Sequence, residues 1–132
     1  AITRELDERV GEASSLGNIG NIYQLLGDYP QALDYQEQSL VLIRELGDRA
    51  IEAKILNNIG FLYERQEDDR AIASYQEAVS IYEEIRKSNQ SLDPALQASY
   101  TAEIESTYRR LSALLRESGR TTEAEAVLDL LK

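Results

Sequence analysis

Two stretches of the chain, Leu16-Gly17-Asn18-Ile19-Gly20-Asn21-Ile22-Tyr23 and Leu56-Asn57-Asn58-Ile59-Gly60-Phe61-Leu62-Tyr63, lie forty residues apart and share five of their residue types at matching positions. The match extends upstream, because Arg4-Glu5-Leu6 returns as Arg44-Glu45-Leu46 at the same offset. An internal repeat of this period is typical of a solenoid, whose short units stack because none of them can bury its apolar face alone. We therefore predict an elongated array of repeated units.

Each unit is predicted to contain two helices. In the first unit the apolar positions recur every three or four residues, which is the spacing of one helical face: Ala13, Leu16, Ile19, Gly20, Tyr23 and Leu26. Gly27-Asp28 ends this helix, and Asp28 with Pro30 starts a second helix that runs to Gly47. A second pair follows Asp48 in the same order, with a turn at Glu67-Asp68-Asp69 that is one residue tighter and has no glycine.

A third unit begins at Asp93-Pro94, a strong helix start, with a long helix that reaches Ser118. Gly119 and Ala124 lie 92 residues beyond Gly27 and Ala32, which is two periods plus twelve, so this helix is about three turns longer at its start. We expect a single array over residues 1–132. It would contain the end of a truncated unit at 1–7 and full units at 10–47, 48–88 and 93–132.

Composition excludes several classes of function. The net charge of −10 would repel phosphate backbones and anionic lipids, so nucleic acid and membranes are not expected as partners. The chain contains no histidine and no cysteine, which removes the usual general base, thiol nucleophiles and common zinc ligands. We expect no enzyme, no cofactor and no metal; Glu67-Asp68-Asp69 is interpreted as a solvated turn. The absence of cysteine also favours a cytoplasmic location.

The helical pairs resemble tetratricopeptide repeats. The first unit has Gly20, Tyr23, the turn Gly27-Asp28-Tyr29 and Ala32 at the positions typical of that family. The second unit retains Gly60, Tyr63, Ala71, Tyr75 and Ala78, and the third retains Gly119 and Ala124 but has Ser112 in place of glycine. Glycine inside a helix costs about 1 kcal/mol relative to alanine, which we expect close approach of the second helix at Ala32 or Ala71 to offset. The resemblance implies an all-α, right-handed superhelix, an α-solenoid.

The forty-residue period resembles the long repeats of kinesin light chains and of many bacterial arrays. The strings Arg44-Glu45-Leu46-Gly47-Asp48-Arg49 and Asn57-Asn58-Ile59-Gly60 are similar to cyanobacterial arrays. The last third of the chain, including Thr107-Tyr108-Arg109-Arg110-Leu111, resembles the segment that precedes a caspase-like CHAT domain in such proteins.

Tetratricopeptide arrays bind an extended or helical peptide in the concave groove lined by the first helix of each unit, so the resemblance implies a site there. The candidate residues lie opposite the packing faces of those helices: Asn18, Asn21, Gln24, Leu25, Lys54, Asn57, Asn58, Phe61, Arg65, Arg109 and Arg110. Asparagine amides can hydrogen-bond the backbone of a ligand without reading its sequence. The plain alternative, a solvated helix face, applies to each of these residues taken singly.

Two more specific interpretations concern the ligand that this groove would bind and the role of Phe61. Asn21, Asn58 and Arg110 match positions of a clamp for a C-terminal carboxylate, but Gly17 and Ser106 stand where that clamp has lysines. Phe61 is either an anchor for the ligand or a contact to the neighbouring repeat.

The predicted function is a scaffold that binds a protein or peptide in the groove without catalysis. One alternative is an assembly segment, a homodimer formed end to end through terminal repeats in which Ile2, Leu6 and Val10 are uncovered. Another is the recognition arm of a CHAT-type protease encoded downstream.

Overall fold

The computed structural model describes residues 2–88 and 94–132, and it describes the side chains of all of these except 2–3 and 94–103. It contains α1 (Ile2–Leu25), α2 (Tyr29–Leu46), α3 (Arg49–Arg65), α4 (Arg70–Ser88), α5 (Pro94–Glu117) and α6 (Thr121–Asp129). The predicted cap Asp93 lies outside the described residues, and so does the side chain of Ile2. The side chains of Leu96 and Tyr100, which the sequence predicts on the apolar face of the long helix in the third unit, also lie outside the described residues.

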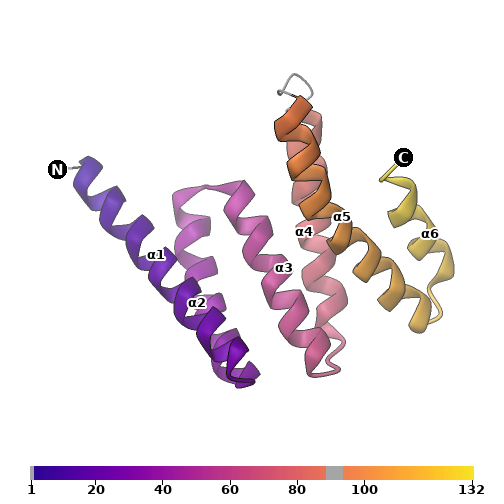
Figure 1. Cartoon of the computed structure of the whole chain (residues 1–132), viewed down its shortest axis with the longest axis horizontal. Coiled ribbons are helices and arrows are strands. Elements are labelled where there is room, and N and C mark those ends of the chain that lie inside the picture. Colours follow the sequence, from indigo (N-terminus) through magenta and orange to yellow (C-terminus); the bar gives the residue numbers. More distant parts are fainter. Residues whose placement is uncertain (1, 89–93) are drawn as a thin grey trace.

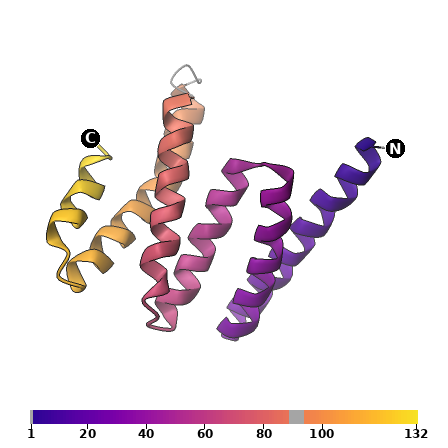
Figure 2. The same cartoon turned by 180° about the vertical axis from the view of Figure 1, so that it is seen from behind.

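The six helices follow one another across the molecule, with the two termini at opposite ends (Figure 1). Each helix packs against the next one in sequence, α1 on α2, α2 on α3, α3 on α4, α4 on α5 and α5 on α6. α2 passes behind α1 in Figure 1 and in front of it in Figure 2, so the two helices of that pair lie in different layers. The fold is an all-α solenoid, as predicted. No helix in the described ranges is long and apolar enough to cross a membrane.

The predicted helix boundaries depend on local chemistry that the structure confirms. The Asp28 side chain accepts a hydrogen bond from the backbone N–H of Gln31 (3.2 Å), and Asp48 caps α3 through Ile51 (3.1 Å). Gly27, Gly47 and Gly119 all have a positive φ between 77° and 80° just beyond a helix end. A left-handed residue there lets the following N–H groups bond the last free carbonyls of the helix.

Glu67 occupies the position that glycine holds in the other turns. Its backbone φ angle is 55°, in the left-handed region that glycine adopts more readily than other residues. The backbone N–H of Asp68 still bonds the carbonyl of Tyr63 at 2.9 Å, as Asp28 bonds Tyr23. The turn therefore keeps this hydrogen bond without glycine, at the cost of a strained residue. The prediction of a tighter turn is wrong, because residues 66–69 separate α3 from α4 whereas only residues 26–28 separate α1 from α2.

The prediction that residues 1–7 end a separate helix is wrong, because α1 runs without a break from Ile2 to Leu25. The position of Gly47, forty residues earlier, is held by Asp7. Without glycine there is no inexpensive left-handed residue to end the helix, and no proline intervenes. Instead, the N-terminal part of α1 extends beyond the C-terminal end of α2. Arg9 of α1 pairs with Glu45 near that end of α2.

The helical glycines allow close approach of the paired helices, but one predicted contact is wrong. A Cβ atom at Gly20 would lie 3.2 Å from the carbonyl oxygen of Ala32, as expected. At Gly60 the obstacle is the ring of Tyr75, 2.7 Å from the position of a Cβ atom, and not Ala71. An aromatic side chain therefore fills the space in the second unit.

The core is continuous from α1 to α6 and includes Tyr63, Tyr75, Tyr82 and Tyr108. Tyr75 and Tyr108 are fully buried, and Tyr63 and Tyr82 are 7% and 2% exposed. Ile19 and Leu26, predicted on the packing face of α1, are instead 37% and 73% exposed. Ile59, forty residues after Ile19, is only 4% exposed, because α3 packs extensively on both α2 and α4, whereas within the described residues α1 packs extensively on α2 alone.

Candidate functional site on the α1, α3 and α5 face

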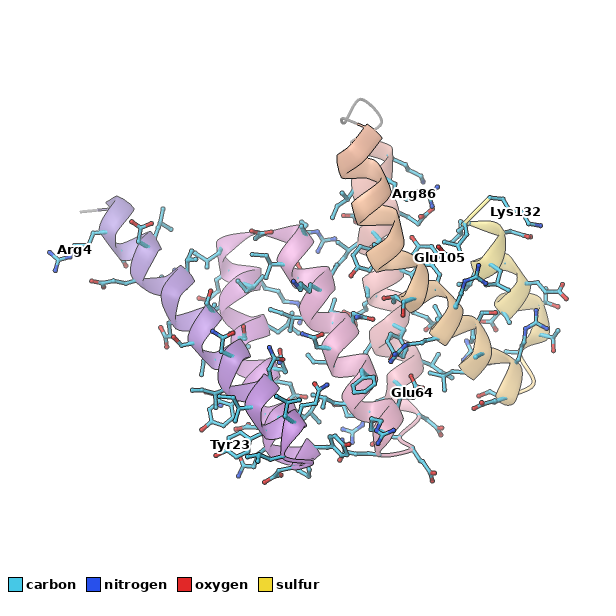
Figure 3. The ribbon with its side chains drawn as sticks, viewed as in Figure 1. Arg4, Tyr23, Glu64, Arg86, Glu105 and Lys132 are labelled. Atoms are coloured by element: carbon cyan, nitrogen blue, oxygen red, sulfur yellow. The ribbon has the colours of Figure 1, made fainter. Side chains whose placement is uncertain are left out.

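A hollow of about 530 Å³ lies between the C-terminal part of α3 and the C-terminal half of α5. Glu64 lines it from α3, and α5 contributes polar and apolar side chains: Glu105, Ser106, Arg109, Arg110, Ala113, Leu114 and Glu117. Figure 3 labels Glu64 and Glu105, one on each of the two helices that border the hollow. We refer to this feature as the α3–α5 hollow.

Arg110, which lines this hollow, contacts Phe61 of α3. The guanidinium carbon of Arg110 lies 5.0 Å from the centroid of the Phe61 ring, which is within cation–π range. Phe61 is half-buried beneath it. Of the two roles predicted for Phe61, a contact to the neighbouring repeat is the one the structure shows. Arg110 itself remains exposed and lines the hollow.

Glu64 is held in place by a buried phenol. The hydroxyl of Tyr75, which is fully buried on α4, donates to Oε1 of Glu64 at 2.9 Å. Burial raises the pKa of Tyr75 well above its usual value, and the hydrogen bond to Glu64 raises it further. Tyr75 therefore stays a neutral donor that fixes the carboxylate at the edge of the hollow.

The other two predicted arginines are engaged with neighbours. Arg109 makes a forked hydrogen bond to Oε1 of Glu105, one turn earlier on α5, at 2.7 and 3.0 Å. Arg65 lies over the ring of Tyr29, 5.8 Å from its centroid, and Nε donates to its hydroxyl at 3.4 Å. Arg109 therefore belongs to the α3–α5 hollow, whereas Arg65 is directed toward the start of α2.

Two of the predicted asparagines make contacts within the scaffold. Oδ1 of Asn21 accepts from Nε2 of the buried Gln36 at 3.1 Å, which links α1 to α2. Oδ1 of Asn57 accepts from the hydroxyl of Thr107 at 2.6 Å, which links α3 to α5. Each of these oxygens links two helices. Because an amide oxygen has two lone pairs, each has one lone pair left to accept a hydrogen bond from a ligand.

The remaining candidates are distributed along the same face. Asn18 and Lys54 are exposed, Gln24 and Asn58 are half-buried, and Leu25 is 87% exposed. The structure thus brings Phe61, Arg109 and Arg110 together around the hollow and leaves the α1 residues apart from it.

Sequence reasoning missed most of the lining, namely Glu64, Glu105, Ala113, Leu114 and Glu117. A signal was present, since residues 105, 109, 113 and 117 recur at every fourth position and so share a face of α5. The depth of the hollow depends on the angle between α3 and α5, which no local pattern gives.

The hollow combines charges of both signs with an apolar floor. Three carboxylates and two guanidinium groups surround Ala113 and Leu114. A second hollow of about 440 Å³ shares Glu64, Leu114 and Glu117 and extends to Asp68 and Asp69. In the part of the chain that the structure describes, no three acidic side chains are grouped to hold a metal ion. Such a surface offers hydrogen-bond donors, acceptors and apolar area to a ligand.

The tetratricopeptide repeat family matches residues 11–84, which is more than half of the chain. The chain belongs to this family. Tetratricopeptide repeat proteins are in general non-catalytic scaffolds, so the fold supports a broad role in protein–protein interaction. Among curated proteins, none matches the sequence.

Two solved structures are similar to this repeat array. The crystal structure of BtubC (BKLC) from P. vanneervenii has a TM-score of 0.71 and 26% identity, covering 90% of this chain and 44% of BtubC. The chain therefore spans less than half the length of BtubC. The TPR domain of Arabidopsis FLU has the same TM-score of 0.71 with 21% identity and covers 93% of both chains, which shows a shared fold.

Proposed function

We propose that the chain binds a peptide or protein segment in the groove of the superhelix, centred on the α3–α5 hollow. The observation that supports this is the hollow itself, whose approximately 530 Å³ is bordered by an exposed arginine held over Phe61. Ligand sites are concave and combine apolar lining with a few placed polar groups. The α3–α5 hollow has both an apolar lining and polar groups in defined positions.

The lining suggests how a segment would be held. Ala113 and Leu114 offer apolar contact to a ligand side chain, while Arg110 and Glu64 offer a donor and an acceptor in fixed positions. Ser106, on the same wall, adds a hydroxyl that can donate or accept. A peptide backbone needs both kinds of partner, so it fits this arrangement better than an anion does. The carboxylate clamp is not part of the proposal.

The test is to obtain ligands from a displayed peptide library and then block the hollow. Ala113→Trp fills it without removing any described contact. Ala126→Trp, at an exposed alanine on α6, is the matched control. We expect selected peptides to lose at least about tenfold in affinity, on the order of 1.4 kcal/mol, with Ala113→Trp, and to bind the control as they bind the wild type.

Fluorescence anisotropy gives the affinities, and circular dichroism confirms that both variants are folded. Peptides that bind both variants equally would place the site elsewhere. Failure to select any peptide would contradict peptide binding as the function.

End-to-end assembly of two copies is the weaker candidate, because it needs the outer face of α6 to complement that of α1. At 92 residues beyond Tyr29, Leu33 and Glu37 of α2, α6 presents Thr121, Glu125 and Asp129, all of them exposed. These polar side chains offer no apolar surface to a second copy. The forty-residue period, the CHAT-associated bacterial type and the cytoplasmic location stay predictions.

A further inference from the structure

We propose that the segment bound at the α3–α5 hollow carries a lysine or arginine, whose side chain lies in the second hollow beside it. This inference rests on the proposed function and names the chemistry of the partner. The second hollow, of about 440 Å³, lies between the turn from α3 to α4 and the C-terminal end of α5. We call it the acidic hollow.

The two hollows are contiguous, because Glu64, Leu114 and Glu117 line both. Their volumes of about 530 and 440 Å³ each fall in the range of roughly 300–1,000 Å³ that is usual for ligand sites. The turn from α3 to α4 and the C-terminal end of α5 both lie toward the lower edge of the array in Figure 1. An extended segment that occupies the α3–α5 hollow therefore continues over Leu114 into the acidic hollow.

The floor of the acidic hollow is apolar. Ala71 is 2% exposed, and Ile72 and Leu114 are half-buried against the core. A lysine or arginine side chain has a methylene stem that lies well on such a surface, while its charged head stays in contact with water. The floor therefore accommodates the stem of a long basic side chain.

The charged groups around this floor are all acidic. Five carboxylates line the acidic hollow, and none of the described residues that line it is a lysine or arginine. Asp68 already has a partner, because Arg70 donates to it at 2.7 Å. Glu67, Asp69 and Glu117 have no ion-pair partner in the part of the chain that the structure describes. These three carboxylates are therefore available to a cationic head, and hydrogen bonds between ionised partners are the strong ones.

The α3–α5 hollow differs in charge, because Arg109 and Arg110 offset part of the charge of its carboxylates. The groove thus changes from mixed charge at Arg110 to wholly acidic at Asp69. This change gives the bound segment a direction, with an apolar side chain on Ala113 and Leu114 and the basic residue toward the turn from α3 to α4. A second copy of the chain, with its net charge of −10, is electrostatically unsuited to this groove.

The probes are the peptides that a displayed library yields against the intact chain, each also synthesised with its basic residues replaced by glutamine. We expect the selected peptides to contain lysine or arginine. Glu67→Gln/Asp69→Asn neutralises two carboxylates that line the acidic hollow alone. It should weaken the selected peptides at least about fivefold in fluorescence anisotropy, through the loss of two partly exposed ion pairs.

The matched control is Glu12→Gln/Glu125→Gln, which neutralises two exposed glutamates outside both hollows. It changes the net charge equally and should leave the affinity unchanged at physiological salt, where charges more than about 8 Å apart are largely screened. The glutamine-substituted peptides should bind the wild type more weakly. They should lose nothing further with Glu67→Gln/Asp69→Asn, because the interaction has already been removed. Circular dichroism confirms that both double variants are folded.

Failure of this inference is distinguishable from failure of the proposed function. If no peptide is selected, or if Ala113→Trp does not weaken the selected peptides, the proposed function fails and this inference fails with it. Suppose instead that Ala113→Trp weakens the peptides. Then only the assignment of the acidic hollow is overturned if their basic residues can be replaced without loss, or if the two double variants weaken binding equally.

Discussion

Glu67 is the residue whose backbone conformation conflicts most with its side chain. A left-handed conformation costs an L-residue roughly 1–2 kcal/mol, and glycine avoids that cost. Since the φ of Glu67 is 55°, Glu67→Gly should raise the free energy of unfolding by about 0.5–1 kcal/mol. Urea denaturation measures the change.

Gly27→Ala provides the opposite test at the matching position, where φ is +80° and a Cβ atom would meet nothing within 4 Å. It should lower stability by about 1 kcal/mol through backbone strain alone. A stabilising effect of Gly27→Ala would contradict this account of the turns.

The helical glycines should respond to alanine in opposite directions. Gly60→Ala places a methyl group 2.7 Å from the Tyr75 ring, and overpacking of this kind costs about 1–3 kcal/mol. Gly11→Ala meets nothing within 4 Å in the helix α1 and should gain up to about 1 kcal/mol of helix propensity. Thermal unfolding of both variants would distinguish them, and equal shifts would show that close approach does not explain Gly60.

Single residues also show the limit of prediction from sequence. Asn21 and Asn57 are predicted to face a ligand because of their position on the helix. Their amide oxygens, however, accept from Gln36 and Thr107, which are 15 and 50 residues away in sequence, respectively. A hydrogen bond across such a separation depends on tertiary packing, which helical periodicity does not contain.

At the scale of the element, the start of α4 is held by a charge pair. Oδ2 of Asp68 accepts from Arg70 at 2.7 Å, and Oδ1 accepts the backbone N–H of Arg70 at 2.9 Å. The side-chain bond to Arg70, helped by the backbone bond, lowers the pKa of Asp68 from 3.8 to about 2. Because the folded pKa is the lower one, this stabilisation is present above about pH 4 and is lost as the pH falls toward 2.

NMR titration of the Asp68 carboxyl carbon measures this directly. We expect a midpoint near 2 in the wild type and a midpoint that moves up toward 3.8 in Arg70→Gln. An unchanged midpoint in the variant would show that Arg70 is not the cause.

Most of the elements could be predicted from sequence because their ends are local. Asp28, Asp48 and the three glycines with positive φ act within a few residues of the helix they start or end. The exception is α1, where similarity to the second unit suggested a break. The break depends on one residue, and at that position Asp7 replaces glycine.

At the scale of the whole molecule, exposure depends on neighbours that periodicity does not reveal. Ile19 and Ile59 are the same residue in matching strings, yet they are 37% and 4% exposed. The depth of the α3–α5 hollow has the same origin, because it depends on how α5 crosses its neighbours. The face that contains the candidate site could therefore be predicted, whereas its walls could not.

The array should lose stability in alkali through two buried tyrosines. Burial raises the pKa of Tyr75 and of Tyr108 above the usual 10.0, and each donates to a glutamate, Glu64 and Glu83. Because the unfolded state ionises first, stability is retained below about pH 10 and falls above it. Tyr108→Phe should flatten this dependence in denaturant titrations at increasing pH. An equally steep decline would show that the phenol is not responsible.

The most direct test of the proposed function is to map a library-selected peptide onto the chain by amide chemical shifts. The largest changes should fall around the α3–α5 hollow, at Phe61, Glu64, Ser106, Arg110 and Ala113. Changes confined to α2, α4 and α6 would contradict it, because they would place the ligand on the opposite layer of the solenoid.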